Sequence, residues 1–406
     1  FPRLRAMLDG VGPLLLPYAP TGVIPDVEGS TRAYPSGLAV GTSGSTGNPK
    51  RAILPTDALR ASVDATHDVL GGPGRWLLVL PPEHIAGLQV ILRSLAADAE
   101  PALGTPGPFT AAGFVADVAR ARAAGGGCRY VSLVPTQLAR LLDDLAATTA
   151  LASFDAVLVG GAATGSDVLT RARGQGLRIV TTYGMSETAG GCVYNGRPLP
   201  GVQVAVRPDE AASEHGAADR ATDRSPPGRI HLGGPTLALG YLPTGGTPAP
   251  RGNSGGSEGD AVGRAGGRVP FEQVDGRRWF RTDDLGTLEA NTLQVLGRVD
   301  DLIVTGGLKV APMVVQEAVA RVLPGLDSVA FAVPDERWGH TVALALVAPS
   351  SRHEALRAQW PRIQQALRAQ LPGPALPRRL VTVAELPLRG PGKPDRAALR
   401  ALAPEQ

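Results

Sequence analysis

The feature that most constrains this chain is the stretch LAVGTSGSTGNPK at residues 38–50, where a short apolar run enters a Gly, Ser and Thr loop. Glycine accepts positive φ and lets the backbone approach a ligand closely, so consecutive N–H groups can converge on an anion. Residues 51–54 predict a second apolar strand, which a solvated linker would not need. The sequence therefore predicts a phosphate-binding loop. Its expected nucleotide contacts are Thr42, Ser43, Gly44, Ser45, Thr46 and Gly47, with a positive charge from Lys50.

The P-loop of NTPases is the main alternative for such a stretch. That motif requires Gly immediately before its lysine and Ser or Thr immediately after it. Here Asn48 and Pro49 precede Lys50, and Arg51 follows it. The order of residues therefore disfavours an NTPase of that class.

Length and composition narrow the class of protein further. A chain of 406 residues can form two or more domains with a large core. Its 40 basic and 37 acidic residues give a net charge of +3 without a basic block, which favours small-molecule partners over nucleic acid. Cys128 and Cys192 lie far apart, as in a reducing compartment, and we expect neither a signal peptide nor an apolar run of membrane-spanning length. We expect a cytoplasmic protein without membrane insertion.

Lysine usage also points to sites of chemistry. Only three of the 40 basic residues are lysine, and all three, Lys50, Lys309 and Lys393, lie in Gly-rich segments. A GC-rich genome would explain the excess of arginine but not these positions. A compact ammonium and a planar guanidinium are not interchangeable at a crowded phosphate. The three lysines are therefore candidates for catalytic contacts with phosphate groups.

Between residues 56 and 182, helical and strand patterns alternate. Apolar spacing predicts helices from Thr56, which we expect to be the N-cap, and near residues 85–97, 114–124 and 136–145. Strands are predicted at residues 76–80, 130–134, 156–159 and 178–182. Such alternation predicts an α/β fold with a mostly parallel sheet covered by helices on both faces. Ligands of these folds bind beyond the carboxyl ends of the strands.

Three strand ends carry informative residues. His84 lies between a strand and a helix, where a ligand contact and a surface role are about equally expected. Gly160, Gly161 and Ala162 follow another strand, and their small side chains would let a flat ring lie against the backbone. The third is the string TTYGMSETAGG at residues 181–191. In it, Tyr183 offers an aromatic face for a purine, and Glu187 offers a hard oxygen ligand for Mg²⁺.

The rest of the chain predicts smaller units. Short strands at residues 202–206, 228–232 and 237–242 indicate a smaller sheet or barrel, interrupted by polar stretches at 207–227 and 243–268 that we interpret as mobile loops without a function. From residue 314 onward, a helix, two strands and a helix predict a small α+β domain.

Taken in order, five motifs make the chain resemble the acyl-adenylate-forming superfamily, which includes acyl- and aryl-CoA ligases and peptide-synthetase adenylation domains. They are the loop at 38–50, the string at 181–191, WFRTDDLG at 279–286, GRVDDLIVTGGLKVAP at 297–312 and LPLRGPGKPDR at 386–396. The resemblance covers the chain from residue 38 onward. Within the family, the local strings are most similar to the o-succinylbenzoate-CoA ligases of menaquinone biosynthesis. The resemblance to the superfamily implies a large ATP- and acid-binding domain at residues 1–297, a hinge near residues 298–300 and a mobile domain at residues 301–406.

The resemblance also implies roles for individual residues. Lys393, Glu187 and Lys50 would be catalytic, and Glu187 would hold the metal. Asp284 would take the ribose hydroxyls, although Asp283 stands where the family has Gly and is a weaker second choice. The remaining implied contacts are Gly160, Gly161, Ala162, Thr182, Tyr183, Gly184, Thr188 and Arg298 for ATP; His84, Met185, Ser186, Ala189 and Gly190 for the acid; Asp300 as hinge; and Gly306 and Gly307 facing CoA.

The implied chemistry uses ATP, Mg²⁺ and CoA as cofactors or co-substrates. A carboxylic acid would be converted to acyl-AMP and then to acyl-CoA, by positioning and electrostatics rather than by a protein nucleophile. Three alternatives stay open: another acyl- or aryl-CoA ligase, an adenylating enzyme that loads a carrier-protein thiol, and a nucleotide-binding protein without catalysis. The oligomeric state, with a homodimer as one option, also stays open.

Overall fold

A computed structural model of the chain describes residues 1–17, 34–42, 50–125, 127–208, 227–242, 270–389 and 393–403. The chain forms two compact units. The first contains residues 1–161, 172–204 and 232–281, and the second contains residues 162–171, 205–231 and 282–406. We describe each unit by itself, and the hinge expected near residues 298–300 stays a prediction.

The first unit contains a seven-stranded sheet in the order β10-β9-β8-β7-β6-β4-β5. The pairs from β5 to β8 are parallel, whereas β8, β9 and β10 pair antiparallel. Both β6 and β7 are buried along their whole length, as continuous apolar runs predict for central parallel strands. The strands are β4 (Trp76–Leu78), β5 (Ala102–Leu103), β6 (Tyr130–Leu133), β7 (Ala156–Val159), β8 (Ile179–Met185), β9 (Gly190–Tyr194) and β10 (Arg197–Pro198).

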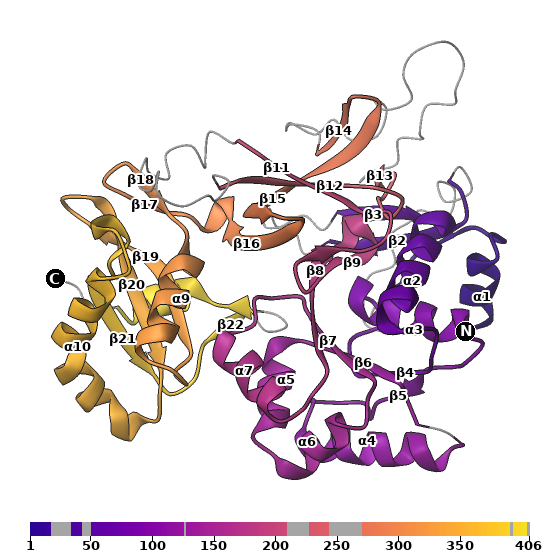
Figure 1. The fold of residues 1–406 in the computed structure, drawn as a ribbon, viewed down its shortest axis with the longest axis horizontal. Helices are drawn as coiled ribbons and strands as arrows, with labels where there is room; N and C mark the ends of the chain where they lie inside the picture. The colour runs from indigo at the N-terminus through magenta and orange to yellow at the C-terminus, as the bar shows by residue number, and fades with distance from the viewer. Residues whose placement is uncertain are drawn as a thin grey trace. The chain divides into compact units, whose positions relative to one another are not determined.

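Helices cover this sheet on two sides. Figure 1 shows α2 and α3 on one side of the parallel strands and α4, α5 and α6 on the other, which confirms the α/β prediction for this part. The helices are α1 (Pro2–Leu8), α2 (Thr56–Leu70), α3 (Ile85–Ala96), α4 (Ala111–Ala123), α5 (Pro135–Leu142), α6 (Leu145–Leu151) and α7 (Ser166–Gly174).

The start of α2 differs from the prediction. Pro55 rather than Thr56 is the N-cap, and no side chain caps the helix. The Thr56 hydroxyl lies 2.7 Å from the Met7 carbonyl oxygen and 3.1 Å from that of Ser36. Thr56 therefore ties α1 to the segment before β2, because its side chain is used for a tertiary contact rather than for capping.

A four-stranded sheet in the order β1-β2-β3-β13 carries the predicted phosphate loop. Strands β2 and β3 form an antiparallel hairpin in which Gly41 pairs with Arg51, and the Thr42 N–H donates to the Lys50 carbonyl at 2.8 Å. The loop therefore connects the two strands that the sequence predicted, although residues 43–49 lie outside the described residues. The strands are β1 (Leu14–Leu15), β2 (Gly37–Gly41), β3 (Arg51–Pro55) and β13 (Gly240–Tyr241).

A third sheet has the order β11-β12-β15-β14, with β16 paired to β15. Its strands confirm the expectation of a smaller β-rich region. We expected mobile loops at residues 207–227 and 243–268. Residues 209–226 of the first stretch and the whole of the second lie outside the described residues. The strands are β11 (Gln203–Arg207), β12 (Gly228–Gly233), β14 (Phe271–Val274), β15 (Arg277–Glu289) and β16 (Thr292–Arg298).

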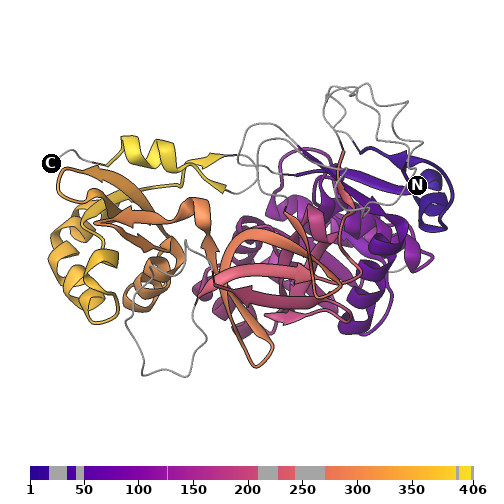
Figure 2. The same ribbon diagram turned by 90° about the horizontal axis from the view of Figure 1, so that it is seen from above.

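The C-terminal part of the second unit is the predicted α+β arrangement (Figures 1 and 2). Its sheet has the order β19 (Ser328–Asp335), β20 (Gly339–Val347) and β21 (Arg379–Val383). Successive side chains of a strand point to opposite faces, so β19 and β20 build two cores. Ala330 and Leu344 pack with α9 (Pro312–Val322) and α10 (His353–Arg368), whereas Phe331 and Ala345 pack with α11 (Arg396–Ala401).

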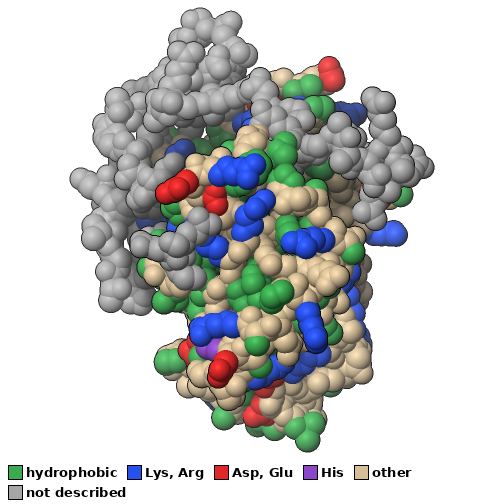
Figure 3. Space-filling view, turned by 90° about the vertical axis from the view of Figure 1, so that its left-hand side faces the viewer, with side chains coloured by type: hydrophobic (Ala, Val, Ile, Leu, Met, Phe, Trp, Pro, Cys, Tyr) green, Lys and Arg blue, Asp and Glu red, His purple; other side chains and the backbone are tan. Residues whose placement is uncertain are grey.

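Two short hairpins complete this unit. They are β17 (Ile303–Thr305) with β18 (Leu308–Val310), and β22 (Leu388–Arg389) with β23 (Lys393–Pro394). On the face shown in Figure 3, Lys and Arg side chains are spread among other types. No helix within the described ranges has the length and hydrophobicity needed to cross a membrane.

Candidate functional site

The turn that carries Glu187 is tied directly to the strand entering the phosphate loop. It is the 3₁₀ helix η2 (Ser186–Thr188), between β8 and β9. The Ser186 hydroxyl donates to the Gly41 carbonyl at 2.9 Å, and the Thr188 hydroxyl lies 3.0 Å from the Met185 N–H, from which it accepts. Glu187 itself is 8% exposed. The structure therefore brings the predicted metal ligand and the start of the phosphate loop together.

A residue that the sequence did not single out joins these two features. The Tyr241 hydroxyl donates to Glu187 Oε1 at 2.7 Å, and the Lys50 ammonium nitrogen lies 5.3 Å from the centre of the Tyr241 ring. Tyr241 reaches this place because β13 pairs with β3, with Tyr241 opposite Ala52. The sequence predicted a strand at residues 237–242 but offered no signal for its partner.

Behind the same turn, the backbone adopts an unusual conformation. Ala189 has φ of +53°, in the left-handed region that non-glycine residues rarely occupy, and it is fully buried. Its carbonyl accepts hydrogen bonds from Gln89 Nε2 at 2.7 Å and from the Ser62 hydroxyl at 3.2 Å. Side chains of α2 and α3 therefore hold the turn from behind. Gly190 lies against α3, since a Cβ built on it would be 3.3 Å from Gln89.

A buried polar network continues behind β9. The Tyr194 hydroxyl accepts from Arg93 at 3.1 Å and lies 3.0 Å from the Thr66 hydroxyl. The Arg93 guanidinium also lies 5.2 Å from the Trp76 ring, in a cation–π arrangement. Burial lowers the pKa of Arg93, which the interaction with Tyr194 partly opposes. Burial, followed by the positive charge of Arg93, lowers the pKa of His67.

The glycine after β7 is explained by packing. A Cβ on Gly160 would lie 2.1 Å from the Thr182 hydroxyl oxygen, so no larger residue fits beside β8. Gly161 has φ of +81°, and its peptide leads into Ala162, which is exposed and begins a segment of the second unit. Contacts of these residues with a purine ring stay a prediction.

The remaining predicted contacts of the first unit lie at the ends of β8 and α3. Tyr183 and Met185 belong to β8 and are half-buried, and Gly184 lies at an irregularity where a Cβ would be 2.1 Å from the Gly190 carbonyl oxygen. His84 is the exposed N-cap of α3. The structure therefore places His84 at the start of the helix that packs against Gly190.

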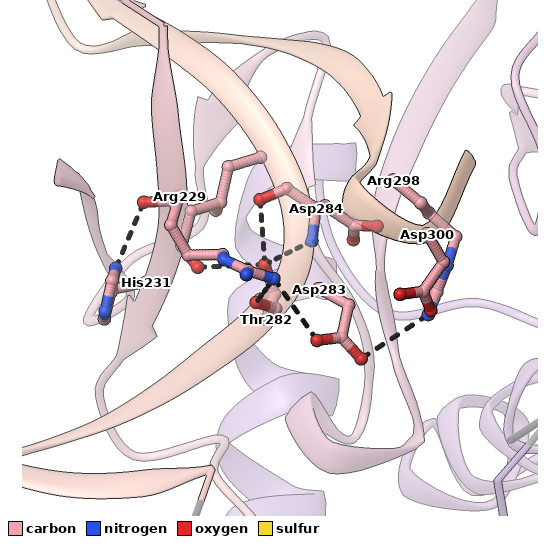
Figure 4. A network of polar contacts seen from close by, with 8 residues as sticks. Arg229, His231, Thr282, Asp283, Asp284, Arg298 and Asp300 are labelled. Atoms are coloured by element: carbon pink, nitrogen blue, oxygen red, sulfur yellow. Dashed lines mark hydrogen bonds and ion pairs between the residues drawn. The ribbon is translucent and has the colours of Figure 1, made fainter. Parts of the chain in front are cut away.

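In the second unit, Asp284 and Arg298 lie opposite each other on β15 and β16. Figure 4 shows the surrounding network, in which Asp283 pairs with Arg229 at 3.3 Å and with Arg298 at 3.5 Å. Asp300 pairs with Arg298 at 3.4 Å. Burial alone would lower the pKa of Arg298, but the negative charges of Asp284, Asp283 and Asp300 outweigh burial and raise it. Asp283 thus has a structural explanation as the partner of two guanidinium groups.

The hairpin with the expected CoA-facing residues turns on two glycines. Gly306 and Gly307 have φ of +56° and +80°, as the tight turn between β17 and β18 requires. A Cβ on Gly306 would lie 2.4 Å from the Trp338 ring. Asp300 lies in the 3₁₀ helix η3 (Val299–Asp301), and Asp301, also in η3, pairs with Arg396.

Some predicted residues cannot be placed. Ser43, Gly44, Ser45, Thr46 and Gly47 lie outside the described residues. Lys393 is placed only through its backbone, which pairs with Arg389 in the hairpin of β22 and β23.

The residues around Glu187 fit a Mg²⁺ ion that is bound together with its nucleotide. Within the described parts of the chain, no three or more His, Cys, Asp or Glu residues form a group that could hold a metal alone. Mg²⁺ is typically bound through one or two carboxylates together with substrate phosphates. One carboxylate beside the stems of the phosphate loop meets that requirement.

Comparisons with known proteins identify relatives of this chain. Residues 41–242 match the AMP-binding enzyme family. The chain is 42% identical over 371 residues to the "Probable 2-succinylbenzoate--CoA ligase" of Mycobacterium tuberculosis H37Rv, a match that covers 89% of this chain and 83% of that protein.

Two solved structures have a similar fold. ATP-bound MatB from Rhodopseudomonas palustris superposes with a TM-score of 0.69 at 23% identity, over 90% of this chain and 67% of that one. The o-succinylbenzoate CoA synthetase MenE from Bacillus subtilis, in complex with the acyl-adenylate intermediate OSB-AMP, gives 0.63 at 22% identity, over 86% and 66%.

Proposed function

The chain belongs to the AMP-binding enzyme family, and from that premise we propose that it is an ATP-dependent ligase that activates o-succinylbenzoate and joins it to CoA. The observation that carries the adenylation chemistry is the hydrogen bond from Ser186 to Gly41, which joins the Glu187 turn to the phosphate-loop hairpin. The choice of acid is supported by the 42% identity to the "Probable 2-succinylbenzoate--CoA ligase" of M. tuberculosis.

The first half-reaction forms acyl-AMP. A carboxylate oxygen of the acid attacks the α-phosphorus of ATP, the bond to the bridging oxygen of the β-phosphate breaks, and pyrophosphate leaves. Lys50 lies at the end of the phosphate loop, where its ammonium group can meet the triphosphate. Donors fixed where charge develops stabilise the transition state without reorganisation.

Glu187 is the residue that would hold Mg²⁺. The ion would supply positive charge to the phosphate oxygens as the α-phosphorus is attacked. The hydrogen bond from Tyr241 to Glu187 Oε1 holds the carboxyl group that would bind the cation.

The nucleoside is assigned to the residues that the family resemblance names. Tyr183, with the Gly160 segment, takes the adenine, while Asp284 takes the ribose hydroxyls and Arg298 the ribose and phosphate. The positions of Asp284 and Arg298 on opposing strands support their joint role. The acid is assigned to the strand end near His84 and to the Met185–Gly190 turn.

In the second half-reaction, the thiol of CoA attacks the acyl carbon. The thiol proton is released, AMP leaves, and o-succinylbenzoyl-CoA is formed. Asp300 serves as the hinge that changes the domain arrangement between the half-reactions, and the Gly306–Gly307 turn faces the thiol substrate. A domain movement of this kind completes the set of catalytic groups for one half-reaction at a time.

The test is an assay of products and rates. The protein is incubated with ATP, Mg²⁺ and CoA, and with o-succinylbenzoate, benzoate or a fatty acid, and thioesters are identified by mass spectrometry while pyrophosphate is measured continuously. We expect o-succinylbenzoyl-CoA, AMP and pyrophosphate, with the highest kcat/KM for o-succinylbenzoate.

Each failure would have its own meaning. A higher kcat/KM for benzoate or a fatty acid would overturn the substrate. Acid-dependent pyrophosphate release without free acyl-CoA would favour an enzyme that loads a carrier protein. If no acid in the panel stimulates pyrophosphate release, the adenylation chemistry itself is wrong.

A further inference from the structure

We propose that Tyr241 is a positioning residue of the adenylation half-reaction, which fixes the Glu187 carboxylate for Mg²⁺ and links it to Lys50. The inference deepens the proposed function and rests on it. Tyr241 contacts both groups: its hydroxyl donates to Glu187 Oε1 at 2.7 Å, and its ring lies 5.3 Å from the Lys50 ammonium nitrogen. Neither the phosphate-loop motif nor the string at 181–191 contains this residue.

The backbone around Tyr241 is built into both parts of the site. On one side, the Leu242 N–H donates to the Arg51 carbonyl at 2.8 Å, next to the end of the phosphate loop. On the other, the Ala238 N–H donates to the Glu187 carbonyl at 2.9 Å. Residues 238–242, the bridging segment, therefore run from the loop to the Glu187 turn through main-chain hydrogen bonds (β13 beside β3 in Figure 1).

Further side chains hold the bridging segment in place. Arg278 donates to the carbonyls of Ala238 at 2.6 Å and Leu239 at 2.7 Å, and its guanidinium lies 4.4 Å from the Phe271 ring. The Tyr241 ring packs on Phe271 at a centroid distance of 6.0 Å. The phenol is thus delivered by a fixed segment, which limits the directions in which its hydroxyl can point.

This arrangement matters because a carboxylate beside a metal must be held in one orientation. Partners that hydrogen-bond to a metal ligand orient it, and their removal typically lowers metal affinity or activity by 10- to 100-fold. The phenol supplies such a bond to a carboxylate that is largely shielded from water. Its ring also offers a negative face to Lys50, which keeps the ammonium near the same phosphates.

Tyr241→Phe separates these two contributions, because it removes the hydroxyl and keeps the ring. We expect the Mg²⁺ concentration for half-maximal pyrophosphate release to rise by about 10- to 100-fold, and the Mg²⁺ affinity measured by calorimetry with a non-hydrolysable ATP analogue to fall by the same factor. Thioester formation from synthetic acyl-adenylate and CoA should stay unchanged, since that step does not involve the triphosphate. Tyr241→Leu, which also removes the ring, should additionally raise the KM for ATP several-fold.

Two controls distinguish positioning from a loss of structure. Tyr130→Phe removes a phenol from the same unit, one that donates to the Leu70 and Gly72 carbonyls, and should leave the Mg²⁺ dependence unchanged. In a Glu187→Gln background, Tyr241→Phe should have little further effect on the Mg²⁺ dependence, because the phenol acts through the carboxylate.

The outcomes are separable from those of the proposed function. If the wild-type protein releases pyrophosphate with its acid and Tyr241→Phe shows the same Mg²⁺ dependence, the positioning role is wrong. Equal losses in both half-reactions, or additive effects with Glu187→Gln, would also overturn it. A wild-type protein without acid-dependent pyrophosphate release would instead refute the proposed function.

Discussion

The Tyr194 network of the first unit is buried and bonded to its scaffold, whereas Asp283, Arg298 and Asp300 of the second unit form a network that is largely exposed. Arg93 is 3% exposed and Thr66 is fully buried, and both contact Tyr194 behind β9. In the second unit, the side chains of Asp283 and Asp300 are 58% and 55% exposed. The polar side chains around Tyr194 are therefore shielded from water, whereas the carboxylates of Asp283 and Asp300 are in contact with it.

Physical chemistry assigns different consequences to the two arrangements. Removing one partner of a buried hydrogen bond leaves an unsatisfied group, so it lowers stability markedly. An exposed ion pair contributes only about 0–1 kcal/mol, because water and salt screen it. Variants of the Tyr194 network should therefore change stability, whereas variants of the exposed Asp283–Arg298 network should change activity while stability is nearly kept.

Lys393→Ala should give the largest effect and the clearest separation. Its ammonium is proposed to neutralise charge between the carboxylate and the α-phosphate, and loss of one such donor typically lowers the rate by about 10²- to 10³-fold. Pyrophosphate release should fall by this amount while the urea midpoint stays unchanged.

The same Lys393 variant provides its own control. Supplied with synthetic acyl-adenylate and CoA, it should still form thioester at nearly the wild-type rate. A lower urea midpoint would break the comparison between the units, and equal losses in both half-reactions would show that the role of Lys393 is misassigned.

Tyr194→Phe should give the largest loss of stability. The substitution removes the oxygen that accepts from Arg93 and contacts Thr66, in a site closed to water. A hydrogen bond to a charged group contributes about 1.5–3 kcal/mol, and we expect the free energy of unfolding to fall by that amount. Urea denaturation measures it.

The matched variant is Tyr130→Phe, whose phenol donates only to neutral carbonyls. It should lower the free energy of unfolding by about 0.5–1.5 kcal/mol. If Tyr194→Phe is as stable as the wild type, the buried network does not stabilise the first unit and the comparison fails.

The pH dependence of stability should sharpen the comparison through His67. Its pKa is lowered mainly by burial and then by Arg93, against the opposing charges of Asp64 and Asp68. Below about pH 6.5, the ordinary value, the unfolded chain therefore binds a proton that the folded protein resists, so stability falls on acidification. Urea denaturation between pH 7.5 and about pH 5.5 should show a smaller loss for His67→Gln than for the wild type. Parallel curves would contradict the assignment.

The sequence predicted the positions of helices and strands better than it predicted which residues contact each other between them. The run at 156–159 gave β7 with its correct ends, because four consecutive apolar residues match a fully buried strand. The α6 helix, LAATTAL, was missed because seven residues with two leucines show too little apolar periodicity to identify a helix. Thr56 was expected to cap α2 because capping is a local rule, but its hydroxyl is used by Met7, which is 49 residues away.

The same limit applies to the candidate site. The motifs singled out the loop between β2 and β3 and the Glu187 turn as candidate sites, since Gly and hydroxyl spacing are local features. Arg93 and Tyr194 are 101 residues apart, and Tyr241 and Glu187 are 54 apart, so their contacts depend on strand order and register. Periodicity within one segment does not contain that information.

Asp283→Asn and Asp284→Asn should give the smallest changes in stability and still distinguish the two carboxylates. Asp283 is 58% exposed and pairs with Arg298 and with the buried Arg229. Because Asn keeps an oxygen that can accept from Arg229, which also donates to the Thr282 carbonyl at 3.2 Å, neutralisation should lower the free energy of unfolding by no more than about 1 kcal/mol. If Asp284 takes the ribose hydroxyls, Asp284→Asn should raise the KM for ATP by about tenfold or more, because hydrogen bonds to a charged group are lost. Asp283→Asn should change that KM much less. The reverse order would assign the ribose to Asp283, and a stability loss well above 1 kcal/mol in Asp283→Asn would show that the exposed network of the second unit stabilises its fold as the buried network does in the first.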